Sequence, residues 1–306
     1  MLFDSVPSTA RGDPVANPPG NRELLGDIIL QSASGPDGAI SSIRYWRKVD
    51  FSHIADNLRE SFRVLASGRQ HGEVRELRGV SIASAGVEFQ MFNAAFLSGP
   101  VTSDAALTQR ILLASLHFQT RGQEWAFWVC EDWMEEGVRK RSRRLFEKHA
   151  LRHSVDLPGM VAERVLPSAR PLPRLAVRRV CDEATREAFC AIGSVCFNVP
   201  LAWFREVFEP PAVWDRFAGY VGYRNAEPIS TAAVVIGSGA AGLYNVATIP
   251  GYQRRGYGEA VMRHALEAAR REHGIERSVL QSTKAGYSLY VHMGYRAVTN
   301  VAVYST

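Results

Sequence analysis

The sequence predicts an α/β (α+β) fold with two tandem domains, each built on a mixed, mostly antiparallel central sheet flanked by helices. Short segments rich in β-branched and aromatic residues alternate with longer segments of helical period. The order strand, long helix, apolar strand, short helix occurs twice, over residues 88–150 and again over residues 242–292. Between these stretches, residues 166–173 carry three prolines, which is typical of a linker.

The chain therefore divides into four parts. Residues 1–21 carry four prolines and few large apolar side chains, so we expect a disordered leader. Residues 22–165 are the first domain, whose ordered part is expected to start at 22–30; residues 166–173 are the linker and 174–306 the second domain. In the first domain the periodicity predicts a helix at 54–65, strands at 73–84 and 88–98, a helix at 104–119 capped by Ser103 or Asp104, a strand at 124–130 and a helix at 137–150.

The second domain is predicted to open with a strand at 175–180 and helices at 182–197 and 203–208. An antiparallel meander follows and ends in a strand at 242–249, which Pro250 closes. From Tyr257 the apolar residues recur with helical period until Gly274 stops the helix. Strands at 278–282 and 296–304 complete the domain.

The composition is that of a globular chain without membrane spans. Hydrophobic residues make up 46% and charged residues 22%, and no apolar run is long enough to cross a bilayer. The chain shows no signal-peptide core, and Cys130, Cys181, Cys190 and Cys196 lack metal-binding spacing, so we expect a cytoplasmic protein with free thiols and no metal. The net charge of +5 is modest, and the basic run at 139–144 lacks the interleaved aromatics of a nucleic-acid site.

A glycine-containing hexapeptide, residues 253–258, lies between the strand at 242–249 and the helix that follows it. A helix N-terminus has backbone N–H groups without intrahelical partners and a partial positive charge. Gly256 and Gly258 allow an anion to approach the backbone, so the hexapeptide indicates a phosphate site, with a plain strand-to-helix turn as the alternative. It has neither the Lys-Ser or Lys-Thr of a Walker loop nor the third glycine of a dinucleotide fingerprint.

Two motifs in the last third of the chain together resemble the GNAT family of N-acetyltransferases. Residues 246–258 are similar to the family's acetyl-CoA-binding signature, and residues 283–296 resemble its late helix, with Leu289-Tyr290 and Gly294-Tyr295 in register. This second motif departs from the family at two positions. Thr283 replaces an Asn, which puts one cofactor contact in doubt, and Gly286 replaces an Ala, which is expected to loosen the helix.

The resemblance implies acetyl-CoA as co-substrate, with no metal. Backbone groups of residues 246–248 would pair with the pantetheine arm like an added strand, and the pyrophosphate would lie on residues 253–259. The implied cofactor-binding residues are Val246, Ala247, Thr248, Gln253, Arg254, Arg255, Gly256, Tyr257, Gly258, Glu259 and Thr283. Tyr290 is implied as the catalytic acid for the departing thiolate, since a phenol with a pKa of about 10 is a reasonable donor.

The base and the acceptor site are less defined. Glu206, Glu209 and Asp215 precede the meander, and Tyr244 and Asn245 lie on its last strand; each is better explained as a surface or structural residue, and a water chain is an alternative base. The segment 197–214 is dense in aromatics, which predicts either an apolar wall for the acceptor or a packed core. Its aromatics are Phe197, Trp203, Phe204, Phe208 and Trp214.

The first domain is predicted to be a degenerate copy of the second. Residues 145–152 resemble residues 289–296, but Phe146 stands where Tyr290 stands and Ala150 where Gly294 stands. No glycine loop precedes the helix at 104–119, and a phenylalanine cannot donate a proton. A different α/β domain with accidental similarity is the alternative. We expect the first domain to cover the sheet or the acceptor cleft of the second.

The resemblance thus implies an N-acetyltransferase that moves an acetyl group from acetyl-CoA to a primary amine of a small molecule or peptide by direct attack. We expect a monomer or homodimer without nucleic-acid or membrane partners. Two alternatives remain open: a non-catalytic acyl-CoA-binding sensor or regulatory module, and an acyltransferase for a longer acyl-CoA, which the aromatic segment permits.

Overall fold

The computed structural model describes residues 36–306, with side chains from Phe51 onward. The chain falls into two units, Met1–Val49 and Asp50–Thr306, and helix α1 (Pro36–Ser67) begins in the first and ends in the second. The predicted leader at 1–21 and the ordered start predicted at 22–30 lie outside the described residues. Among the described helices, none combines the length and apolarity that a bilayer crossing requires.

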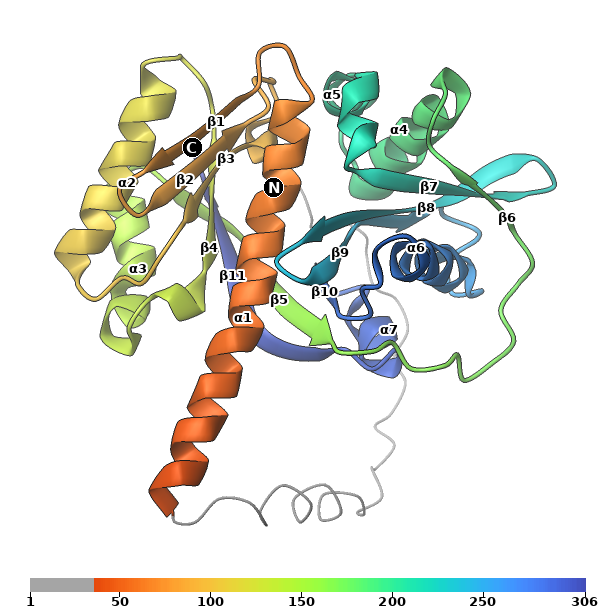
Figure 1. The fold of residues 1–306 in the computed structure, drawn as a ribbon. Helices are drawn as coiled ribbons and strands as arrows, with labels where there is room; N and C mark the ends of the chain where they lie inside the picture. Colours follow the sequence, from red (N-terminus) through yellow and green to blue (C-terminus); the bar gives the residue numbers. More distant parts are fainter. Residues whose placement is uncertain (1–35) are drawn as a thin grey trace, which may run out of the picture. The chain divides into compact units, whose positions relative to one another are not determined.

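The second unit is built on one sheet of eleven strands (Figure 1). The strand order across the sheet is β1-β2-β3-β4-β11-β5-β10-β9-β8-β7-β6. Only the pairs β3–β4 and β9–β10 are parallel, so the sheet is mixed and mostly antiparallel, as predicted. The bounds are β1 (Glu73–Leu77), β2 (Val80–Ser84), β3 (Asn93–Leu97), β4 (Ala126–Cys130), β5 (Arg152–Ala162), β6 (Ala176–Arg179), β7 (Ala218–Arg224), β8 (Glu227–Gly237), β9 (Ala240–Thr248), β10 (Ser278–Gln281) and β11 (Arg296–Ser305).

The two halves of the sheet repeat the same order outward from its centre, apart from the extra edge strand β6. β11 and β5 are central, and β4-β3-β2-β1 on one side correspond to β10-β9-β8-β7 on the other. Each parallel pair is joined by a long helix, α2 (Asp104–Gln119) or α6 (Tyr257–His273). A short helix then leads to a central strand: α3 (Glu136–Lys148) leads to β5 and α7 (Tyr287–His292) leads to β11.

The halves exchange their central strands. β5 comes from the first half but pairs with β10 of the second, while β11 comes from the second half and pairs with β4 of the first. β5 and β11 also pair with each other along most of their length. The sequence predicts a separate sheet in each domain and no strand at residues 152–162. Pro158 and Gly159 interrupt that segment like a turn, and only its pairing with two neighbours makes it a strand.

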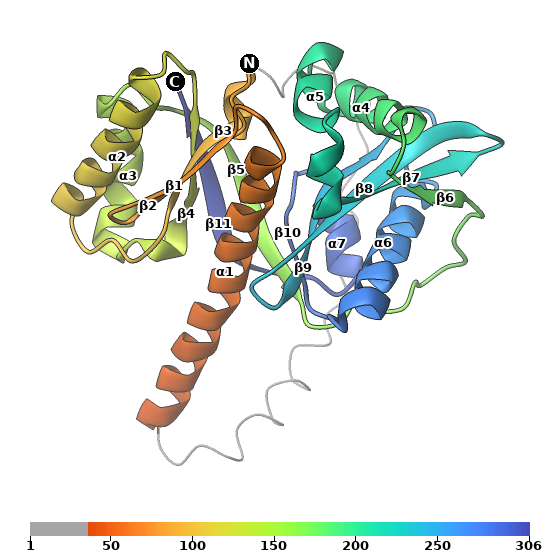
Figure 2. The same ribbon diagram turned by 45° about the horizontal axis from the view of Figure 1, so that its top comes forward.

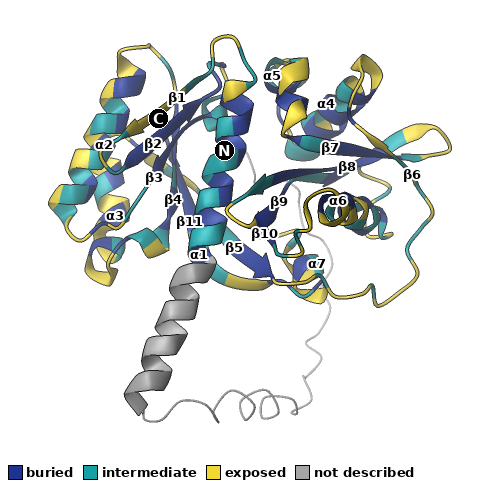
Figure 3. Cartoon of the chain, viewed as in Figure 1, coloured by how far each residue is buried: buried dark blue, intermediate teal, exposed yellow. Residues whose placement is uncertain are grey.

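Helices cover both faces of the sheet (Figure 2). α2, α3, α6 and α7 lie on one face, and α1, α4 (Glu183–Phe197) and α5 (Leu201–Phe208) lie on the other. The alternation of side chains along β5 shows the division: Met160 packs with the α6 residues, and its neighbour Val161 packs with Ile54 of α1. Figure 3 shows that the strands between these helices are largely buried.

Most predicted elements are present with shifted ends. α2 and α6 have the predicted bounds, and the Ser103 hydroxyl caps α2 by accepting the Ala106 N–H at 3.2 Å. The predicted strand at 73–84 is instead a hairpin, β1–β2, because Gly79 takes a left-handed conformation with φ 77°. The predicted strand at 88–98 begins with a 3₁₀ turn (Gln90–Phe92) before β3.

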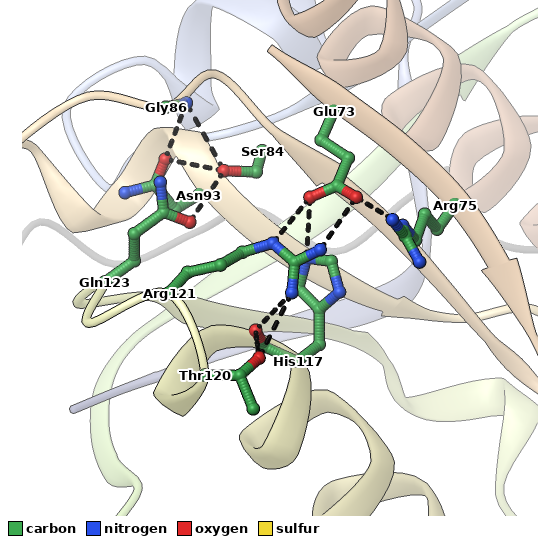
Figure 4. A network of polar contacts seen from close by, with 9 residues as sticks. All are labelled: Glu73, Arg75, Ser84, Gly86, Asn93, His117, Thr120, Arg121 and Gln123. Atoms are coloured by element: carbon green, nitrogen blue, oxygen red, sulfur yellow. Dashed lines mark hydrogen bonds and ion pairs between the residues drawn. The ribbon is translucent and has the colours of Figure 1, made fainter. Parts of the chain in front are cut away.

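Two polar networks connect elements of the unit. In the first half, Glu73 of β1 accepts hydrogen bonds from Arg121 and lies 3.5 Å from His117 of α2 (Figure 4). At the junction of the halves, the Asn57 side chain of α1 donates to the carbonyls of Val235, Gly237 and Ala240 at the end of the β8–β9 hairpin. α1 is thereby attached to the second half by buried hydrogen bonds.

Candidate functional site

The glycine loop lies at the N-terminus of α6. Gly256 is the N-cap and has φ 86° and ψ 0°, a left-handed conformation that favours glycine. The first intrahelical hydrogen bond joins the Ala260 N–H to the Gly256 carbonyl, and no side chain among the described residues caps the helix. The N–H groups of residues 257–259 therefore lack intrahelical acceptors, which is the arrangement that binds anions.

Three guanidinium groups surround this loop. Arg254 and Arg255 belong to it, and neither has an ion-pair partner within residues 51–306, whereas Arg263 one turn further along α6 pairs with Glu259. The third is Arg170 of the linker, whose Nη2 lies 3.8 Å from the position that a Cβ on Gly256 would take. No sequence motif indicates Arg170, because only the path of the linker across the loop brings it there.

Two predicted phosphate ligands use their side chains for internal contacts. The Gln253 amide donates to the Thr248 carbonyl at 3.0 Å, which fixes the loop to the end of β9. Glu259 is buried and accepts from Arg263 at 2.9 Å, and Arg263 in turn donates to the Leu166 carbonyl of the linker. Only the backbone N–H groups of Gln253 and Glu259 are therefore available to contact a phosphate.

The two glycines and Tyr257 pack the loop tightly. A Cβ on Gly258 would lie 3.0 Å from the Thr248 hydroxyl, and a Cβ on Gly256 would lie 3.1 Å from Pro173 of the linker. Tyr257 is buried, with its ring 5.8 Å from that of Tyr252 in an edge-to-face contact. The loop is thus held in one conformation by its neighbours on both sides.

β9 is irregular at the point where the cofactor is predicted to bind. Its register with β8 shifts between Ala247 and Tyr244, and Asn245 has φ 47°, so β9 contains a bulge. β9 pairs with β10 only at Ala241 and Gly242. Beyond that point residues 246–248 have no partner strand on the β10 side, although Ala247 and Thr248 remain paired with β8. This open edge can accept an extended ligand as an added strand.

Tyr290 lies on α7 with its ring buried and 8% of its surface exposed. Burial raises the pKa of Tyr290 to about 12, and its hydroxyl has no hydrogen-bond partner among the described side chains and backbone groups. Gly286 makes room for this ring: a Cβ there would lie 2.8 Å from Cε2 of Tyr290. Thr283 is exposed and begins the turn into α7, where its hydroxyl accepts the Gly286 N–H at 3.3 Å.

The structure gives the base candidates other roles. The Tyr244 hydroxyl donates to Asn57 at 2.7 Å, and burial raises the pKa of Tyr244 above its usual range. Glu206 accepts the Glu88 N–H at 3.3 Å, and Glu209 and Asp215 are exposed. Burial alone raises the pKa of Tyr290, with no contribution from these carboxylates, so no side chain is assigned as the base.

The aromatic segment at 197–214 belongs mainly to the core. Phe204, Phe208 and Trp214 are buried in the cluster that joins α4 and α5 to the sheet. Phe197 and Trp203 are partly buried, and Trp203 stacks on Phe89 of the first half at 5.1 Å. The sequence allows an apolar wall for the acceptor or a packed core, and the structure places three of the five aromatics in the core.

The corresponding parts of the first half have a different geometry. α2 is capped by Ser103, and Asp104 in its first turn pairs with Arg141 at 2.8 Å, so negative charge already occupies this helix end. β3 and β4 pair at three successive positions, Ala94 to Phe96, and β2–β3 has no register shift. The first half therefore has neither a glycine loop, nor a bulge, nor a separated strand pair at these positions.

The helix ends at residues 146–151 and 290–295 do correspond. The Leu151 N–H donates to the Phe146 carbonyl at 3.1 Å, and the Tyr295 N–H donates to the Tyr290 carbonyl at 3.0 Å. Ala150 and Gly294 both have positive φ, 62° and 94°. Phe146 is fully buried and stacks on Tyr304 at 4.1 Å, so a hydrocarbon ring fills the place that a phenol takes in the second half.

Comparison with known proteins agrees with this geometry. Residues 215–297 match the family model of the acetyltransferase (GNAT) domain. The fold is similar to that of a GCN5-related N-acetyltransferase from Kribbella flavida, with 15% identity, a TM-score of 0.60 and coverage of 76% of this chain and 89% of that one. It is also similar to a conserved protein of unknown function from Staphylococcus epidermidis, with 11% identity, a TM-score of 0.56 and coverage of 77% and 94%. A comparison with curated proteins finds no similar sequence.

Proposed function

We propose that the chain transfers an acetyl group from acetyl-CoA to a primary amine of a small molecule or peptide, in keeping with the match of residues 215–297 to the acetyltransferase (GNAT) domain. The observation that carries the proposal is the open edge of β9 directly before a helix whose N-terminus is capped only by glycine. These two features lie in one continuous segment, residues 246–259. A phosphate-bearing, extended cofactor fits both at once.

The cofactor would bind through two kinds of contact. Its pyrophosphate would accept hydrogen bonds from the N–H groups of residues 256–259, with Arg254 and Arg255 as side-chain donors and Arg170 adding charge from the linker. Its pantetheine arm would pair with residues 246–248, whose edge toward β10 is unpaired. Acetyl-CoA is a co-substrate here, and the chemistry needs no covalent enzyme intermediate.

In the proposed reaction the neutral amine attacks the thioester carbonyl carbon, so that a C–N bond forms and the C–S bond breaks with its electron pair on sulfur. The proton of the amine passes to water. We propose Tyr290 as the group that stabilises the thiolate by donating a hydrogen bond. Because the pKa of Tyr290, at about 12, exceeds the value of about 8.5 for an ordinary thiol, complete proton transfer from the phenol is unfavourable, and water supplies the final proton.

The first half is proposed to be a degenerate copy with a structural role. Its strand order and its helix end at Phe146 match those of the second half, but its helix N-terminus is capped by its own side chain. We therefore expect one acetyl-CoA per chain. The proposed division into domains at 22–165 and 174–306 describes this duplication, although the strands β5 and β11 cross it.

Calorimetric titration of acetyl-CoA tests the site. We expect binding of one equivalent to the wild type and loss of binding in Gly256→Glu, because the new side chain would extend from the loop toward Pro173 and Arg170 and place a carboxylate beside the proposed phosphate site. Gly251→Glu is the matched control: Gly251 is in the same loop with φ 87°, and its Cβ direction is open, so it adds the same charge and a similar backbone strain.

A fold check by thermal unfolding accompanies both variants. Equal loss of binding in Gly251→Glu and Gly256→Glu would contradict a specific phosphate site, and two equivalents bound to the wild type would contradict a degenerate first half. Retained acetyl-CoA binding with no transfer to any member of a primary-amine panel would favour a sensor. Tighter binding and faster transfer with a longer acyl-CoA would favour the other alternative.

A further inference from the structure

Two side-chain amides near the open edge of β9 lack partners. The Nδ2 atom of Asn245 and the Nε2 atom of Gln281 are both buried and make no hydrogen bond with the described residues. Whichever way each amide is turned, one polar end is buried. A buried donor without an acceptor has lost its hydrogen bonds to water without replacing them, so such a group in a folded protein points to a ligand or a water that satisfies it.

Both residues lie beyond the last pair of β9 and β10. Ala241 pairs with Ser278, and Gly242 pairs with Val279. Gln281 lies two residues after the last paired residue of β10, and Asn245 lies three residues after the last paired residue of β9. Asn245 is in the bulge of β9, where its φ of 47° turns the backbone. The two unpartnered amides thus belong to the two strands that separate, on either side of the separation.

Gln281 faces α1 rather than α6. It is two residues from Val279, which packs with Ile54 of α1, and the residue between them, Leu280, packs with α6. Its cross-strand neighbour on β5 is Gly159, where a Cβ would lie 3.1 Å from Ile54. The same Cβ would lie 2.5 Å from Cγ2 of Thr299, so the glycine lets Ile54 and Thr299 approach the strand beside Gln281.

The proposed cofactor comes from the opposite face. Its phosphates would bind at the N-terminus of α6, which covers the other side of the sheet. A group that reaches the thioester from the α1 face is therefore the acceptor. A pair of carboxamides is uncharged and offers both donors and acceptors, which matches a neutral amide; a free carboxylate would leave a buried charge without a cation.

We propose that Asn245 and Gln281 bind an amide group next to the reacting amine, so that the acceptor is an amino-acid amide or a peptide N-terminus. This inference rests on the proposed acetyl transfer and narrows its acceptor. The sequence marks Asn245 only as a base candidate and does not mark Gln281 at all, because neither residue has a ligand signature. Only the structure shows that their amides are unpaired.

The test compares glycinamide with isobutylamine, in which an isopropyl group replaces the amide. The ratio of kcat/KM for the two amines is measured in the wild type and in Gln281→Met and Asn245→Gly, at one pH, so that the difference in amine basicity cancels between proteins. Glycine at Asn245 keeps the positive φ. We expect each variant to lower the ratio about 10- to 100-fold, mainly through glycinamide.

Two controls make the same chemical changes elsewhere. Gln119→Met changes an exposed glutamine at the end of α2, and Asn225→Gly changes an exposed asparagine with φ 50° in the β7–β8 turn. Both should keep the wild-type ratio. Free glycine as a third substrate should react less well than glycinamide; a preference for glycine would overturn the choice of a neutral amide.

Thermal unfolding separates binding from structure. Gln281→Met should not lower Tm, because the amide has no partner to lose. A lower Tm with an unchanged ratio would assign the amide to a bound water and overturn the inference. If the wild type transfers acetyl groups and both variants keep the wild-type ratio, this inference alone is overturned. If the wild type binds acetyl-CoA but transfers to neither amine, the proposed function is overturned and the inference falls with it.

Discussion

At the scale of the residue, Tyr290 combines a buried ring with a hydroxyl that bonds to no described residue. Its neighbour Tyr295 is the opposite case, since the Tyr295 hydroxyl donates to Ser278 at 2.6 Å. The two rings lie 5.8 Å apart in edge-to-face contact. A phenol that packs but has no hydrogen-bond partner is available to a ligand, whereas a satisfied one contributes to the fold.

We expect Tyr290→Phe to lower kcat about 10²-fold, because the thiolate loses a hydrogen-bond donor, while the Kd for acetyl-CoA is unchanged. Since burial raises the pKa of Tyr290 to about 12, the ratio of wild-type to variant kcat should stay constant from pH 7 to pH 10. Tyr295→Phe is the matched control: it should keep kcat but lose about 1 kcal/mol of unfolding free energy. Wild-type kcat in Tyr290→Phe would remove Tyr290 from the mechanism.

We expect the protonation of His117 to make the free energy of unfolding depend on pH. Burial and the charge of Arg121 lower the pKa of His117 below its usual 6.5, against the opposing effect of Glu73 (Figure 4). The unfolded chain therefore binds a proton more readily than the native one, and His117 lowers the free energy of unfolding as the pH falls below about 6.5.

Urea unfolding of the wild type and His117→Gln at pH 7 and pH 5 measures this contribution. The variant removes the titrating group, so its stability should fall less over this interval, and the gap between the two proteins should narrow. A gap that widens toward pH 5 would mean that Glu73 stabilises a charged imidazole at 3.5 Å more strongly than burial disfavours it.

At the scale of the element, two corresponding helices begin differently. α2 and α6 occupy corresponding places, but α2 begins with a serine cap and an acidic first turn, and α6 begins with a glycine. The sequence predicts both beginnings, because caps depend on a few local residues. It does not predict β5, since the strand character of residues 152–162 depends on partners more than 100 residues away in sequence.

The exchanged strand leads to a prediction about fragments. A fragment of residues 174–306 lacks β5, so β11 loses both of its partners and β10 keeps only its short pairing with β9. A fragment of residues 152–306 retains β5 between β10 and β11. We expect cooperative thermal unfolding of the longer fragment only, and aggregation of the shorter one through its unpaired edges.

Circular dichroism during heating, with size-exclusion chromatography of both fragments, provides the measurement, and the full chain is the reference. A soluble fragment of residues 174–306 with full acetyl-transfer activity would show that the first half is dispensable for the fold and for the proposed site.

At the scale of the whole unit Asp50–Thr306, the first half completes the second. It supplies β5 to the sheet, and α1 supplies Asn57, which holds three carbonyls of the β8–β9 hairpin and accepts the Tyr244 hydroxyl. Gly242 has no side chain where Asn57 approaches: a Cβ there would lie 1.8 Å from its Oδ1. This dependence gives a physical reason for retaining a half without a glycine loop.

The sequence by itself determined the features that depend on neighbouring residues. These are the strand, glycine loop and helix at residues 242–273, the Ser103 cap and the correspondence of Phe146 with Tyr290, and they were enough to suggest the family. Only the tertiary structure decided the features that depend on distant residues. These features are the exchange of β5 and β11, the position of Arg170 and the unpartnered amides of Asn245 and Gln281. They depend on which strands pair and on which polar groups are buried away from water, and no local pattern of side chains encodes either.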